Sequence, residues 1–135
     1  MIDSAHDVYE WAKSEGLIHK KEEQITLLIV DLKKDIVEEL LVGMGDSESC
    51  IMSVEKLARV ALSHPAEYSF ILVHNHPYPG EAIPSEEDIE TTKITSNLLA
   101  ALNRDLSDHV IVADGEFYSF DQQVRAIIID DTKKL

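Results

Sequence analysis

The stretch from Tyr68 to His76, YSFILVHNH, limits the possible folds more than any other part of the sequence. It is nearly continuous in apolar residues and is followed by Pro77, which has no backbone N–H to extend a strand ladder. Apolar runs without alternation are typical of strands that are buried on both faces. The stretch therefore predicts a central strand, with two histidines at its carboxyl end.

Helical and strand patterns alternate on either side of this run. Helices are expected before Gly16, after the cap residue Ser53, and after Ser85. The helix after Ser85 is expected to carry the apolar residues Ile89, Ile94, Leu98 and Leu102. Helices interleaved among strands in this way predict an α/β fold, with a mixed sheet flanked by helices.

Three further segments fit strands. A pair of strands is expected within residues 24–42, around a polar turn at 31–35. A hairpin is expected at 109–120, because Asp114-Gly115 suits a turn with positive φ at both central residues. The tail at 124–131 fits a final strand or a docking helix, and the pattern leaves both open.

Length and composition set the broad class. The 135 residues predict one domain, 1–135, that buries a core without disulfides or a structural metal. The lone cysteine, Cys50, excludes an internal disulfide and is expected to be a packed or idle thiol. The start of the chain does not resemble a signal peptide and no apolar run reaches membrane-spanning length, so a cytoplasmic location is expected.

The charge argues against one class of partner. The net charge is -14, from 26 acidic and 12 basic residues, and the basic residues cluster in nothing longer than a pair. Such a charge repels phosphate backbones, so direct binding of nucleic acid is not expected.

The residues after the central strand suggest a metal site. Side chains two apart on a strand point the same way, so His74 and His76 present both imidazoles in one direction. Asp88, in the first turn of the next helix, can offer a carboxylate to the same point. Two imidazoles and one carboxylate leave a tetrahedral zinc ion one open position for water, as in catalytic sites. Zinc lowers the pKa of such a water to about seven.

The same residues also suit an ordinary capped helix. Pro84 precedes the hydroxyl cap Ser85, and the acids that follow it favour the helix dipole. The residues alone leave both interpretations open. His109, inside the hairpin, is expected to pack or to hydrogen-bond rather than to bind a metal.

The motif resembles the JAB/MPN metalloprotease family, and more narrowly its RadC-type branch. That branch carries a JAMM motif: an upstream glutamate, then H-N-H-P, a turn, and P-S-x-x-D-I. Here the sequence has His74-Asn75-His76-Pro77, Pro84-Ser85 and Asp88-Ile89. The likeness runs from about residue 20 to residue 120 and includes SDHVIV and FYSF downstream. The resemblance implies a fold similar to that of cytidine deaminases.

The resemblance also implies a role for each residue of the motif. His74, His76 and Asp88 would bind zinc, Glu23 would be the general acid and base, and Ser85 would stabilise the polarised carbonyl oxygen. The neighbours Glu22 and Glu87 remain alternatives for the base and for the carboxylate ligand. Eleven residues separate His76 from Asp88, one more than is usual in the family.

Three functions follow as hypotheses. The first is a zinc-dependent hydrolase of peptide or isopeptide bonds, with a peptide or protein as its substrate. The second is a DNA-repair-associated accessory role, since RadC-type proteins carry a DNA-repair label. The helix-hairpin-helix module that commonly precedes this domain has no counterpart in the sequence. The third is a metal-binding scaffold module without catalysis.

Overall fold

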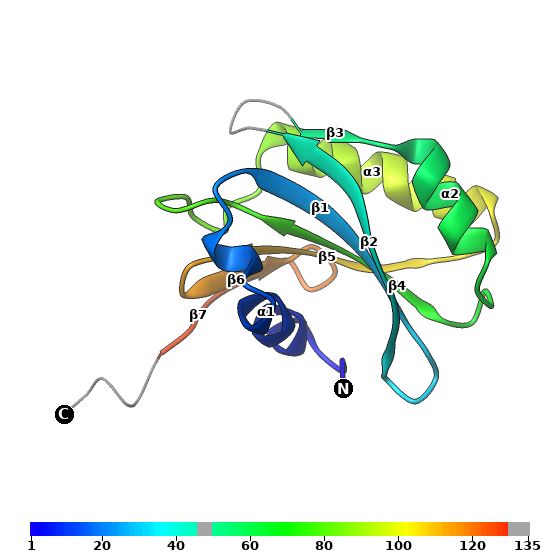
Figure 1. Cartoon of the computed structure of the whole chain (residues 1–135), viewed down its shortest axis with the longest axis horizontal. Helices are drawn as coiled ribbons and strands as arrows, with labels where there is room; N and C mark the ends of the chain where they lie inside the picture. Colours follow the sequence, from blue (N-terminus) through cyan, green and yellow to red (C-terminus); the bar gives the residue numbers. More distant parts are fainter. Residues whose placement is uncertain (46–49, 130–135) are drawn as a thin grey trace.

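The computed structural model describes residues 1–45 and 50–129 and consists of a mixed sheet with helices on both faces (Figure 1). The seven strands lie in the order β3-β2-β1-β4-β5-β6-β7. The strands are β1 (Glu23–Val30), β2 (Ile36–Gly45), β3 (Cys50–Met52), β4 (Ser69–Asn75), β5 (Leu106–Ala113), β6 (Glu116–Ser119) and β7 (Val124–Ile127). The helices are α1 (Ala5–Ser14), the short 3-10 turn η1 (Leu17–His19), α2 (Val54–Leu62) and α3 (Glu86–Ala101).

Strand β4 lies at the centre of the sheet, as its apolar sequence predicts. It pairs antiparallel with β1 and parallel with β5. Its residues from Phe70 to Asn75 are all buried. The α/β class, with a mixed sheet between helices, is therefore confirmed.

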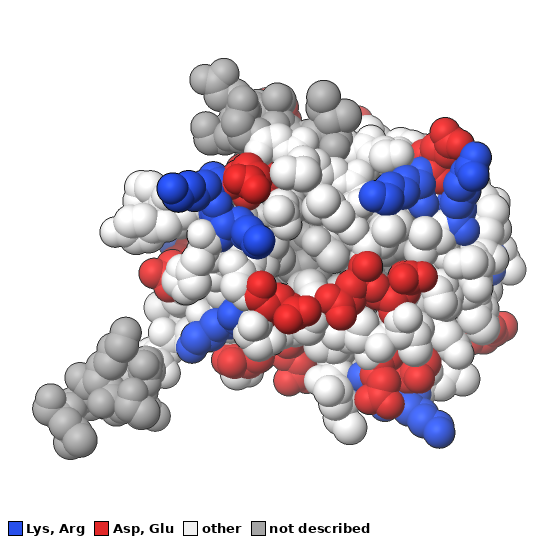
Figure 2. Space-filling model, in the orientation of Figure 1, with Lys and Arg blue, Asp and Glu red and all other residues white. Residues whose placement is uncertain are grey.

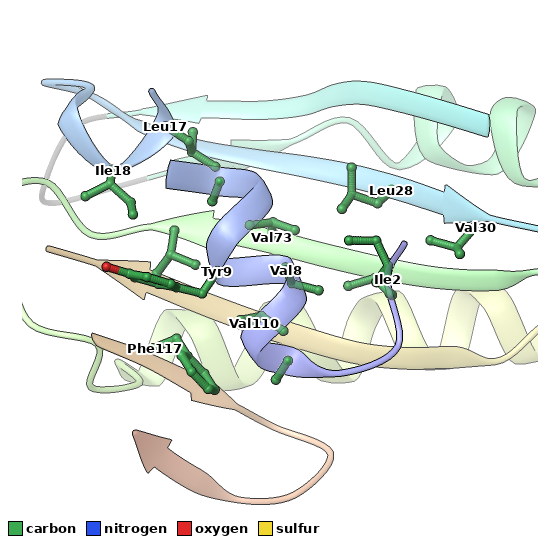
Figure 3. Packing of buried hydrophobic residues seen from close by; sticks show 14 residues of the cluster. Ile2, Val8, Tyr9, Leu17, Ile18, Leu28, Val30, Val73, Val110 and Phe117 are labelled. Atoms are coloured by element: carbon green, nitrogen blue, oxygen red, sulfur yellow. The ribbon is translucent and has the colours of Figure 1, made fainter. Parts of the chain in front are cut away.

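The two faces of the sheet have separate cores. On one face, α1 and η1 pack against alternate strand residues such as Leu28, Val73 and Val110 (Figure 3). On the other face, α2 and α3 cover Leu27, Leu72 and their neighbours. The residue alternation of a strand decides which side chains meet which helices. Side chains in phase with Leu72 on β4 therefore face α3.

Only some of the apolar side chains of α3 face the core. Leu98 and Leu102 pack against the core, but Ile89 and Ile94 are 42% and 43% exposed. The residues of α3 that are fully buried are Asp88, Thr95 and Leu99. The helix after Ser85 is therefore confirmed, and a carboxylate takes the inward position in its first turn.

Other expectations need smaller corrections. The two strands β3 and β7 add to the predicted order, and β7 answers the open question of the tail as far as residue 129. In the β5–β6 turn, positive φ occurs at Gly115 and not at Asp114, so the expected turn type was wrong. The expectation for the Cys50 side chain lies outside what the structure describes. Within residues 1–45 and 50–129, no helix has both the length and the apolar character that crossing a bilayer requires.

Candidate metal centre

The two histidines lie where β4 ends. His74 is in the strand, faces α3 and is 4% exposed, and His76 follows directly after the strand. Backbone pairing of β4 with β1 ends at Ile25 and His74. Pairing with β5 continues beyond this point, since the His76 amide donates to the carbonyl of Val112 at 2.8 Å. The two imidazole rings are edge-to-face, with centroids 5.2 Å apart.

Glu23, the first residue of β1, reaches the same place. It shares a strand face with Ile25 and Leu27, which pack toward α2 and α3. One of its carboxylate oxygens, Oε2, lies 3.4 Å from Nε2 of His74. The alternative residue Glu22 is exposed and out of phase with this face.

Asp88 approaches from the first turn of α3 and is 2% exposed. Its Oδ1 lies 2.8 Å from Nδ1 of His74, and its Oδ2 lies 3.0 Å from Nε2 of His76. Asp88 also forms a capping box with Ser85: its Oδ2 accepts from the Ser85 amide at 2.8 Å. Asp88 therefore both caps α3 and contacts the two histidines. Glu87 is exposed beside it.

The hydrogen bonds at this centre leave nitrogens of both imidazole rings available to a cation. Nδ1 of His76 lies 2.6 Å from the carbonyl oxygen of Glu81, and since a carbonyl only accepts, this nitrogen carries a hydrogen. In the neutral ring, Nε2 then turns a lone pair toward the carboxylate of Asp88. Both nitrogens of His74 are buried without a hydrogen bond of proper geometry among the described residues. A cation could bind one nitrogen of each ring, because the two nitrogens of an imidazole point in different directions.

The acidic neighbours also change the ionisation of the site. Burial alone lowers the pKa of His74, but the carboxylates of Asp88 and Glu23 outweigh it and raise the pKa to about 9. Burial raises the pKa of Asp88, whereas the two histidines lower it by more, so that it lies well below its usual range. Behind the centre, burial and then the charge of His74 lower the pKa of His109 to about 3.

These residues fit a divalent metal ion. Donor atoms of Glu23, His74 and His76 all lie within 4.8 Å of one another. Imidazole nitrogens and carboxylate oxygens are the ligands that zinc and related ions prefer. The fixed Nδ1–H of His76, bound to a backbone carbonyl, is the arrangement usual for a metal-binding histidine. Asp88 contacts both histidines, at Nδ1 of His74 and at Nε2 of His76.

An open cleft of about 870 Å³ lies beside the centre. Glu23, His76 and Ser85 line it, together with the loop from Pro77 to Gly80. The oxygen of Ser85 accepts a hydrogen bond from the Asp88 amide at 3.1 Å. Its hydroxyl hydrogen has no acceptor among the described residues and remains available to a bound molecule.

The sequence analysis assigned no role to two residues that support the centre. Asn75, between the histidines, is fully buried and hydrogen-bonds the backbone on either side of Glu23. Thr92, on α3, contacts both Asp88 and His109. A polar residue at the end of a buried apolar strand is a signal that could have drawn attention to Asn75. Its hydrogen-bond partners, however, lie some fifty residues away in the sequence.

Comparison with known proteins identifies the family of the chain. Proteins named UPF0758 from Methanosarcina mazei and Methanococcoides burtonii are 36% and 34% identical to the chain, over 87% and 90% of its length. A UPF0758 protein of Staphylococcus carnosus is 30% identical over 87% of the chain. The chain spans about half the length of these relatives, 50 to 52%. The family model of the RadC-like JAB domain matches residues 2–125, and the chain belongs to that family.

Proposed function

We propose that the protein is a zinc-dependent hydrolase of the JAMM type, which cleaves peptide or isopeptide bonds. The observation that carries the proposal is the convergence of His74, His76, Asp88 and Glu23, with both nitrogens of His74 buried and lacking a hydrogen bond among the described residues. Membership of the RadC-like JAB family supports the same chemistry.

Within this proposal, His74, His76 and Asp88 are the ligands, and Glu23 stays free of the metal. Asp88 is almost fully buried and touches both histidines at 2.8 and 3.0 Å. Glu23 contacts His74 at the longer distance of 3.4 Å, and it lines the open cleft. A buried carboxylate suits a permanent ligand, and one at the cleft wall suits proton transfer to and from substrate.

The roles of the remaining groups follow from their positions. When bound, the zinc ion supplies a Lewis acid and activates water near neutral pH. Glu23 takes the proton released by the attacking water and delivers it to the leaving amine. Ser85 donates its free hydroxyl hydrogen to the carbonyl oxygen of the scissile bond as negative charge develops there.

Metal content and hydrolysis, measured together in three variants, test the proposal. Glu23→Gln should keep zinc and lose hydrolysis of peptide and isopeptide substrates. His76→Ala and Asp88→Asn should lose both. If Asp88→Asn kept zinc and Glu23→Gln lost it, the two carboxylates would have the opposite roles. A wild-type protein that binds zinc but hydrolyses neither class of bond would instead be a metal-binding scaffold.

We also propose that the chain does not contact nucleic acid directly, which weakens a DNA-repair role exercised through DNA binding. The support is its charge of -14. Figure 2 shows acidic side chains in a band across the middle of one face, with lysines and arginines toward the periphery. The cleft beside the centre carries Glu22, Glu86 and Glu87 against a single lysine, Lys21. These carboxylates repel a phosphate backbone.

A further inference from the structure

A fully buried histidine lies directly behind the candidate centre. His109 is on β5, opposite Leu72 of β4, and faces α3. Its ring lies nearly parallel to that of His74, with centroids 6.1 Å apart and an interplanar angle of 15°. On the other side it stacks on Phe120 at 4.8 Å. The three rings are therefore stacked in the order His74, His109, Phe120.

Thr92 connects the same histidine to the first turn of α3. Its hydroxyl donates to the carbonyl oxygen of Asp88 at 2.7 Å. The hydroxyl oxygen of Thr92 also lies 2.6 Å from Nδ1 of His109. A hydroxyl has one hydrogen, which the carbonyl uses, so Nδ1 of His109 must be the donor to Thr92. The result is a chain of two hydrogen bonds from β5 through Thr92 to the backbone of Asp88.

These two hydrogen bonds attach the part of α3 that does not pack against the apolar core. The core contacts of α3 come from Thr95, Leu98 and Leu99 in its second half. In the first half, Ile89 is exposed, and the buried residue is Asp88. A carboxylate at this place gains little from burial in itself. The hydrogen bonds through Thr92 therefore supply an attachment that hydrophobic packing does not.

We infer that His109 and Thr92 are positioning residues of the metal centre: His109 backs the ring of His74 and, through Thr92, fixes the backbone of Asp88. The inference rests on the ligand set proposed above. One buried imidazole thereby sets the separation of two ligands that come from different elements, β4 and α3. Groups that orient ligands in this way make a site rigid before the metal arrives.

Zinc affinity, measured by competition with a chromophoric chelator, tests the inference in four variants. Thr92→Val keeps the shape of the side chain and removes both hydrogen bonds, so its affinity should fall about ten- to a hundredfold. Thr92→Ser keeps the hydroxyl and should bind nearly as wild type does. His109→Phe keeps a stacking ring but no donor and should also bind more weakly. Thr91→Val is the matched control, since the Thr91 hydroxyl has no partner among the described residues.

Two further measurements distinguish this positioning role of Thr92 and His109 from an effect on overall stability alone. The losses of Thr92→Val and His109→Phe should not add in the double variant, because each breaks the same chain. The visible spectrum of the Co²⁺-loaded protein should shift in Thr92→Val and stay unchanged in Thr91→Val. If wild type binds zinc and Thr92→Val and His109→Phe bind it equally well, the inference is overturned. If wild type itself does not bind zinc, the proposed function fails first, and the inference with it.

Discussion

Asn75 holds Glu23 in place through the backbone on both of its sides. The side-chain oxygen of Asn75 accepts from the amide of Gln24 at 2.7 Å, and its nitrogen donates to the carbonyl of Glu22 at 3.1 Å. Backbone pairing between β1 and β4 has already ended at this point. The side-chain amide therefore continues the sheet by one step, at the residue proposed to move protons.

Replacement of Asn75 by Asp should destabilise the protein. The variant loses the donor to the carbonyl of Glu22 and places a second acceptor against it in a fully buried position. A buried polar group left unsatisfied costs about 1–3 kcal/mol, and more if it is charged. Urea denaturation at neutral pH measures the loss. Asn97→Asp, at an exposed position on α3, is the control and should change stability little.

Zinc should stabilise the wild-type protein and a chelator should reverse the effect. An ion that binds only the folded state, at roughly one hundred times its Kd, adds about 2.7 kcal/mol. Thermal denaturation with and without zinc measures the shift in Tm. His76→Ala should fold but show no shift, because it lacks one of the ligands. An equal shift in wild type and in His76→Ala would place the bound zinc elsewhere.

Much of the fold and of the centre could be predicted, because the deciding signals are local. The apolar run through Phe70 to Val73 requires burial on both faces, which made β4 central. Strand alternation put His74 and His76 on one side of the chain. The spacing from Ser85 to Asp88 is that of a capping box, which fixes where α3 begins.

The remainder depends on contacts that no local pattern contains. The helical phase of α3 follows from Asp88, which must point inward, and this turns Ile89 and Ile94 outward. Hydrophobic periodicity alone does not determine this helical phase. The functions of Asn75 and Thr92 depend on partners in β1 and β5, and these partners become neighbours only when the sheet has formed.

The loop over the cleft should tolerate no side chain at Gly80. A Cβ there would lie 2.6 Å from the carbonyl oxygen of Pro77 and 3.3 Å from Cβ of His76. Gly80→Ala should therefore shift the loop, including the Glu81 carbonyl that orients His76. Loss of such an orienting contact weakens metal binding roughly tenfold or more. Chelator competition measures it.

The control for this prediction is Glu81→Ala. The Glu81 side chain is exposed, and the variant keeps the backbone carbonyl that His76 uses. It should bind zinc as wild type does. Equal zinc affinity in wild type and in Gly80→Ala would mean that the loop can adjust without moving His76.

Nucleic acid should not bind even where electrostatic attraction is strongest. Phosphate contacts tighten steeply as salt is lowered, so a gel shift at low ionic strength is the most sensitive condition. With 26 acidic residues against 12 basic ones, we expect no shift of single- or double-stranded DNA. A shift that disappears as salt is raised would refute this expectation and restore a direct role at DNA.

The metal-free protein should lose stability as the pH rises from about 6.5, the ordinary pKa of histidine, toward 9. His74 has its pKa raised to about 9 in the folded state, so it holds its proton more tightly there than in the unfolded chain. That contribution is complete below the unfolded pKa and is lost as the pH rises through the folded one. Urea midpoints of the chelator-treated protein across this range measure the loss.

Zinc should remove this alkaline loss, because a metal-binding imidazole is neutral and the ion takes the place of the proton. His109 acts in the opposite sense: its pKa of about 3 means that the folded state resists its protonation, so stability falls as the pH drops below about 6.5. His74→Asn, measured without metal, should lack the loss above pH 6.5 and keep the one below it. Equal alkaline loss in the zinc-loaded and metal-free wild type would mean that no ion replaces the proton of His74.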